Sequence, residues 1–261
     1  MSDPKTNDAS NTVAQEQPLF SHLVELRNRL LKSIIFILVI FLSLFYFAND
    51  LYLIMVEPLS ELLPEKGEMV AVGVASPFLV PFKMTMVLAI FLAVPFILHQ
   101  AWSFIAPGLY KHEKKFAIPL LLSSIVLFYA GIAFAYFVVL PLAFGFFTSV
   151  GPEGVTLMPD INNILNFILK MFFAFGIAFE IPIATFLMVL MGMTTVESLA
   201  SKRPYIFLGC FVVGMLVTPP DVISQTVLAV PMWMLFEIGV LFSRLIKKDD
   251  DAESGASEVD S

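Results

Sequence analysis

Six long apolar stretches set the main constraint on how this chain of 261 residues can fold. A helix needs about 20 apolar residues to cross the hydrocarbon core of a bilayer, which is about 30 Å thick. The chain is 58% hydrophobic and 14% charged, whereas about 25% of the residues in a typical soluble domain are charged. We therefore expect an all-α polytopic membrane protein with spans at residues 30–48, 80–101, 117–141, 161–192, 205–218 and 222–243.

The distribution of Lys and Arg predicts how these spans are oriented. Basic residues lie before the first span, between the second and third, between the fourth and fifth, and after the sixth: Arg27, Arg29, Lys32, Lys111, Lys114, Lys115, Lys202, Arg203, Arg244, Lys247 and Lys248. The other three connections contain only Lys66. Because cytoplasmic loops carry the excess of basic residues, both termini are predicted to be cytoplasmic.

The spans are predicted to be bent and to form a concave, cup-shaped bundle. The fifth span holds 14 residues, enough for about 21 Å of helix, and Glu237 interrupts the sixth, so both are expected to be short. Proline removes a backbone hydrogen bond and bends a helix, and prolines lie in or beside most spans: Pro81, Pro95, Pro119, Pro182 and Pro231. The polar segments 1–17 and 247–261 are expected to be disordered, which leaves 18–246 as the membrane domain.

One carboxylate, Glu180, lies deep in the apolar sequence "GIAFEIPIATF" at residues 176–186. A charged side chain at the bilayer centre costs at least about 2.5–3.5 kcal/mol, and such residues are usually functional. Pro182 cannot donate to the carbonyl of Ala178, so polar backbone is also freed at this depth. Two interpretations stay open: a protonated Glu180 that hydrogen-bonds another helix, or a polar pocket open to water or substrate on the concave side.

Two more acids lie within basic segments, Glu25 in "SHLVELRNRLL" and Glu113 in "FIAPGLYKHEKK". Glu25 and Arg29 are four residues apart and can pair along a helix surface, and Glu113 can pair with a neighbouring Lys. Alternatively, the two carboxylates form a site for a cationic ligand at the membrane surface. Arg presents a planar fork that a carboxylate binds through two hydrogen bonds, so two adjacent guanidinium groups would fit such a site.

Other classes of function find little support in the sequence. The single cysteine, Cys210, allows no disulfide or cysteine metal site within the chain, and there is no H-E-x-x-H motif or phosphate-binding loop, so we expect neither an enzyme nor a cofactor. His22, His99 and His112 are interpreted as interfacial. A small-solute transporter coupled through Glu180 and Glu237, or a scaffold for other membrane proteins, remains an alternative.

Several sequence blocks, taken together and in order, resemble the TatC family. They are "SHLVELRNRLL", "ASPF", "FIAPGLYKHEKK", "FAYFVVLPLAFGFF", "AFGIAFEIPIA", "KRPY" and "VGMLVTPPDVISQT", and the resemblance covers about residues 18–245. TatC is the core, signal-reading subunit of the twin-arginine protein translocase. The resemblance implies six bent helices in a cupped bundle, and transport of folded proteins across the bacterial cytoplasmic (inner) membrane by the proton-motive force.

The resemblance also implies roles for individual residues and partners. Glu25 and Glu113 would meet the two arginines of a signal peptide, and the same cytoplasmic site would include Arg27, Phe104, Pro107, Tyr110 and Lys111. Glu180 would be a buried polar site on the concave face, and Pro58 a functional position in the outer loop. Single-span TatA-type and TatB-type subunits would dock at Met215, Thr218, Pro219, Pro220, Asp221 and Gln225. Several copies of the chain would assemble in the complex, with no role for nucleic acid.

Overall fold

The computed structural model describes the backbone of residues 7–53, 70–105, 117–149, 160–218 and 222–259. Over these ranges the regular structure is helical, apart from one isolated bridge between Val70 and Asp160. The all-α fold class is therefore confirmed. The elements are α1 (Asn7–Phe45), α3 (Ser76–Ile105), α4 (Ala117–Phe134), the π-helix η3 (Ala135–Val139), α5 (Leu140–Ser149), α6 (Ile161–Ala178), α7 (Ile181–Leu190), α8 (Val196–Ser201), α9 (Arg203–Val217) and α10 (Val222–Val259).

Five helical segments of the described residues are long and apolar enough to cross a membrane. They are Leu23–Phe45, Ser76–Ile105, Ala117–Phe147, Ile161–Leu190 and Val222–Arg244. The apolar helix α9 is shorter, at 15 residues. These six segments fall where the six apolar stretches of the sequence predict spans.

Two spans differ in length from the sequence-based expectation. The apolar part of α10 runs for 23 residues, so only the fifth span is short; Glu237 does not end the sixth because an Arg pairs with it. The third span continues past 141 to Phe147 through η3 and α5, and α5 itself ends at Ser149. α1 and α10 include residues 7–17 and 247–259, and the disorder of these two segments stays a prediction.

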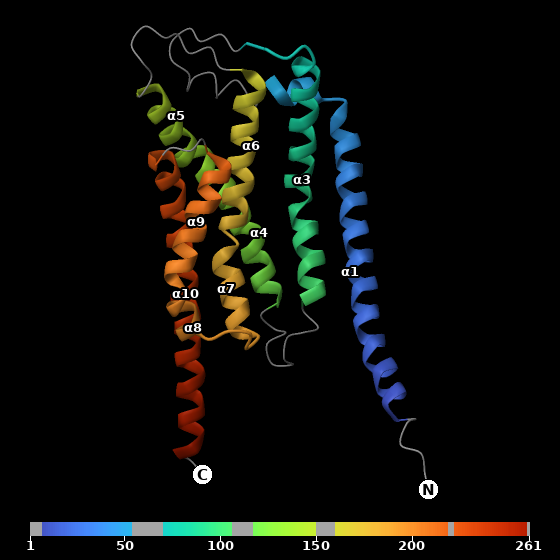
Figure 1. Cartoon of the computed structure of the whole chain (residues 1–261), viewed down its shortest axis with the longest axis vertical. Coiled ribbons are helices and arrows are strands. Elements are labelled where there is room, and N and C mark those ends of the chain that lie inside the picture. Colours follow the sequence, from blue (N-terminus) through green and yellow to red (C-terminus); the bar gives the residue numbers. More distant parts are fainter. Residues whose placement is uncertain (1–6, 54–69, 106–116, 150–159, 219–221, 260–261) are drawn as a thin grey trace.

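The helices pack side by side, with α1 at one edge of the bundle and α10 toward the other (Figure 1). α1 packs mainly on α3, α4 packs on α6, and α10 packs on α7 and α9. Only 11% of the apolar window of α1 is buried, against 44% of that of α3, so most of α1 is left to face lipid. Phe91, Phe128 and Phe172 meet in the main core between α3, α4 and α6.

Proline residues cause two irregularities in the spanning helices. α6 ends at Ala178 and α7 begins at Ile181, and Pro182 in the first turn of α7 has no N–H to continue the ladder. The π-helical turn Ala135–Val139 lies just before Pro141 in α5, where a wider turn relieves the clash of the proline ring. The first irregularity places the backbone of Glu180 at a break between two helices.

Candidate functional site

The N-terminal end of α1 and the C-terminal end of α10 lie at the same end of the bundle, which we call the terminal end (Figure 1). Close to it, Glu25 and Arg29 form an ion pair on α1. Arg29 donates from Nε and Nη2 to Oε1 of Glu25 at 3.0 Å and 2.6 Å. Its third nitrogen, Nη1, donates to Oε1 of Gln100 on α3 at 3.4 Å. The carboxylate of Glu25 thus already holds a guanidinium group, at the junction of α1 with the end of α3.

The other residues predicted for this site are only partly within the described structure. Arg27 is exposed on α1, and Phe104 is half-buried on α3, one turn beyond Gln100. α3 ends at Ile105, five residues after Gln100, which contacts the Glu25–Arg29 pair. Pro107, Tyr110, Lys111 and Glu113 lie outside the described residues. The structure therefore brings Glu25 to the end of α3 and leaves its distance from Glu113 untested.

The carboxyl group of Glu180 lies at the break between α6 and α7 and is half-buried. The Ser124 side chain on α4 is close enough to hydrogen-bond it, and Trp102 on α3 donates from Nε1 to Oγ of Ser124 at 3.3 Å. Oε1 of Glu180 is buried and has no hydrogen-bond partner among the described residues. A series of polar side chains, Trp102 on α3 and Ser124 on α4, thus leads to Glu180, and one carboxyl oxygen of Glu180 still lacks a hydrogen-bond partner among the described residues.

The residues predicted to dock partners lie around the turn between α9 and α10, at the end of the bundle opposite the terminal end. Met215 is 52% exposed. Thr218 is buried and donates to the carbonyl of Gly214 at 2.8 Å, and Gln225 donates to the carbonyl of Phe211 at 2.7 Å. Pro219, Pro220 and Asp221 lie outside the described residues, as does Pro58. Of the three described docking residues, Met215 alone presents a large exposed side chain. The side chains of Thr218 and Gln225 instead donate hydrogen bonds to backbone carbonyls of α9.

An ion pair that was not predicted from the sequence joins α9 to α10. Thr195 caps α8 by accepting from the backbone N–H of Ser198, and the short α8 leads directly into Arg203, the first residue of α9. Arg203 donates from Nη2 to Oε2 of Glu237 at 2.7 Å. A signal for it exists in the sequence: Arg203 lies fifteen residues before Thr218 and Glu237 fifteen residues after Val222. Two antiparallel helices joined by a short turn therefore place these charges at the same height.

A second missed cluster lies nearer the opposite end, between α3 and α6. Lys83 donates from Nζ to Oδ1 of Asn166 at 2.7 Å, and Asn166 donates to Asn162 at 3.3 Å. Lys170 is exposed one turn beyond Asn166. Cys210 is a buried free thiol, and the described residues contain no group of three or more His, Cys, Asp or Glu side chains that could hold a metal ion.

Comparison with known proteins gives consistent matches over almost the whole chain. The family model described as Sec-independent protein translocase protein (TatC) matches residues 21–231. The protein of this name from Azotobacter chroococcum is 58% identical over 246 residues, covering 94% of this chain and 96% of its own length. That from Escherichia coli K12 is 56% identical over 233 residues, covering 89% and 90% of the two chains.

A solved structure gives the same result for the fold. The crystal structure described as the twin arginine translocase receptor TatC matches with a TM-score of 0.78 at 40% identity, covering 86% of this chain and 98% of that one. Helix order, apolar segments and sequence thus agree along the chain. The chain belongs to the TatC family and is a subunit of the Sec-independent protein translocase, a component of membrane transport rather than an enzyme.

Proposed function

We propose that this chain reads twin-arginine signal peptides at the terminal end of the bundle and thereby selects folded proteins for transport. The observation that carries the proposal is the Glu25–Arg29 pair. Oε1 of Glu25 accepts two hydrogen bonds from one guanidinium group, at 2.6 Å and 3.0 Å, which is the chemistry that a signal-peptide arginine requires. The solved relative is itself described as a translocase receptor.

A second carboxylate completes the proposed site. Glu113 follows α3 in the chain, and α3 lies against the Glu25–Arg29 pair through Gln100. Two carboxylates would hold two adjacent arginines, each by charge-assisted hydrogen bonds whose net contribution is about 1.5–3 kcal/mol apiece. The neighbouring residues of the proposed site are Arg27, Phe104, Pro107, Tyr110 and Lys111.

Glu180 is proposed to assist the passage of the signal peptide across the bilayer. Its unpaired buried oxygen is able to hold water or a polar backbone group at that depth. We expect transport to fall in the Glu180→Ala variant and to be partly kept in Glu180→Gln, which retains hydrogen bonding. Full transport activity in both variants would show that Glu180 contributes to packing and not to transport.

Partner subunits are proposed to complete the translocase. Single-span TatA-type and TatB-type subunits would dock near Met215 and the turn between α9 and α10, with contributions from Thr218, Gln225, Pro219, Pro220 and Asp221, while Pro58 acts in the outer loop. Several copies of the chain would assemble in the bacterial inner membrane, with both termini cytoplasmic, and the proton-motive force would drive transport. The exposed side chain of Met215 and the concentration of basic residues near the termini support this arrangement.

The direct test is equilibrium binding of a twin-arginine signal peptide to the purified full chain. Glu25→Gln removes the charge of one carboxylate but keeps its shape, and we expect the affinity to fall by roughly tenfold or more, as the loss of a charge-assisted hydrogen bond predicts. Asp50→Asn is the matched control, because Asp50 is an exposed carboxylate beyond the other end of α1. Unchanged binding in Glu25→Gln, with Asp50→Asn also unchanged, would contradict the proposal.

A further inference from the structure

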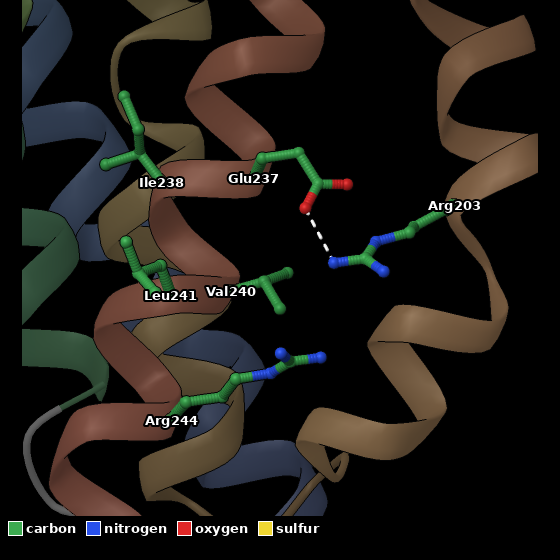
Figure 2. A pocket seen from close by; sticks show the side chains of 6 residues that line it. All are labelled: Arg203, Glu237, Ile238, Val240, Leu241 and Arg244. Carbon is green, nitrogen blue, oxygen red and sulfur yellow. Dashed lines mark hydrogen bonds and ion pairs between the residues drawn. The ribbon is translucent and has the colours of Figure 1, made fainter.

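A cavity lies between α9 and α10 near the terminal end, where both helices reach the edge of their apolar segments. Its volume is about 240 Å³, and its lining is Arg203, Glu237, Ile238, Val240, Leu241 and Arg244. Figure 2 shows Arg203 extending from α9 toward Glu237, and Arg244 extending from α10 into the same gap. The lining therefore carries two positive charges against one negative charge.

The charges of this cavity are not balanced within the described part of the chain. Glu237 pairs with Arg203 through Oε2 and Nη2, but Oε1 of Glu237 and Nε of Arg203 are buried without a hydrogen-bond partner. Arg244 is exposed, and the described ion pairs, Arg29–Glu25 and Arg203–Glu237, do not include it. A polar ligand that enters the cavity, with the water it carries, would supply partners for groups that the described protein leaves unsatisfied.

The cavity lies at the end of the apolar segments, which is the level at which we expect lipid phosphates. Arg244 is the last residue of the apolar segment Val222–Arg244, and Arg203 is the first residue of α9. α9 has 15 residues and a length of about 22 Å, which is shorter than the hydrocarbon core. Arg203 therefore lies closer to the hydrocarbon core than the first residue of a full-length span would, at a level that lipid headgroups can reach.

The surface next to the two arginines is apolar and open to lipid. Leu241 and Phe242 are 57% and 56% exposed, and Ile238 and Leu241 line the cavity itself. A free anion would gain nothing from this surface, whereas the acyl chains of a lipid would cover it. Basic pockets between spanning helices on the cytoplasmic side are suited to anionic headgroups.

We propose that this cavity is a binding site for an anionic glycerophospholipid. The phosphate contacts the guanidinium of Arg244 and the edge of Arg203 that Glu237 leaves free, and the acyl chains lie along Ile238, Leu241 and Phe242. Glu237 has two effects: it orients Arg203, and it reduces the positive charge of the cavity. The site does not depend on the signal-peptide function proposed above.

The test is native mass spectrometry of the purified full chain, titrated with phosphatidylglycerol or with phosphatidylcholine of the same acyl chains. We expect Arg244→Gln to weaken phosphatidylglycerol binding by about fivefold, the usual effect of one basic residue at a membrane surface, and to leave phosphatidylcholine binding unchanged. Glu237→Gln is expected to strengthen phosphatidylglycerol binding, because it removes the negative charge. Lys202→Gln is the matched control: Lys202 is an exposed cation next to Arg203 but does not line the cavity.

The two variants on α10 therefore have opposite expected signs, which a general loss of folding would not produce. The proposal is overturned if Arg244→Gln binds phosphatidylglycerol as wild type does, or if Lys202→Gln is equally impaired. It is also overturned if inorganic phosphate displaces phosphatidylglycerol at comparable concentration, since the site would then recognise the anion without its acyl chains. Failure of inorganic phosphate to compete, with the expected signs in both variants, supports the lipid.

Discussion

The described residues include two carboxylate–guanidinium pairs with nearly the same N–O distance, and the two pairs differ in almost every other respect. Arg29 and Glu25 are four residues apart in the sequence of α1, and Nη2 of Arg29 lies 2.6 Å from Oε1 of Glu25. Arg203 and Glu237 are 34 residues apart in the sequence and join α9 to α10. Nη2 of Arg203 lies 2.7 Å from Oε2 of Glu237. The side chain of Glu25 is 40% exposed and that of Glu237 is 27% exposed, and only the second pair includes buried polar atoms without partners.

The two ion pairs differ in how easily a ligand can open them. An ion pair between helix residues four apart is worth about 0.3–0.5 kcal/mol, so another arginine can replace Arg29 at little cost. Opening the pair between α9 and α10 leaves charged groups partly buried in the membrane, which costs far more. We infer that the pair on α1 serves recognition, whereas the pair between α9 and α10 holds two helices together.

The close packing of α10 on α7 fixes the position of Glu237, and disrupting it should have the largest effect on stability. A Cβ at Gly239, two residues after Glu237, would overlap Oγ1 of Thr185 and would lie 2.8 Å from Cα of Pro182. We expect Gly239→Ala to lower the free energy of unfolding in detergent by about 3 kcal/mol, because backbone must move. Gly209→Ala on α9 is the control, since nothing lies within 4 Å of its added Cβ, and it should be neutral or slightly stabilising.

Removing one arginine from each pair compares the two pairs directly. We expect Arg203→Ala to lower the free energy of unfolding by about 2 kcal/mol, since it leaves Glu237 half-buried without its partner. Arg29→Ala is expected to cost less than about 0.5 kcal/mol. Both are measured by denaturant titration of the full chain in one detergent. Equal losses in the two variants would remove the distinction between a pair for recognition and a pair for stability.

The smallest expected effect concerns competition within the recognition pair. If an incoming arginine must replace Arg29 at Oε1 of Glu25, then Arg29→Gln removes the competitor and also one positive charge that repels the ligand. We expect the affinity for a twin-arginine peptide to rise by up to about fivefold, in line with the small free energy of an exposed pair. A fall in affinity would show instead that Arg29 positions Glu25 for binding.

The apolar segments could be predicted from the sequence because each depends mainly on its own composition. The shortness of α9 followed from Pro204 and Pro219 at its two ends, and the pairing of Glu25 with Arg29 followed from their helical spacing. The contact of Ser124 with Glu180 could not be predicted, since it depends on how α4 packs against α6. The pairing of Glu237 with Arg203 could not be predicted from composition, so Glu237 wrongly indicated a short sixth span, although the predicted bounds 222–243 lie within one residue of Val222–Arg244.

The most direct test of the account asks whether Glu25 distinguishes arginine from lysine. The affinities of a twin-arginine peptide and a twin-lysine peptide are measured for the wild-type chain and for Glu25→Gln. Lysine carries the same charge but lacks the planar fork, so the wild type should prefer the twin-arginine peptide by roughly tenfold or more. We expect this preference to largely disappear in Glu25→Gln. A preference of the same size in both proteins would contradict it.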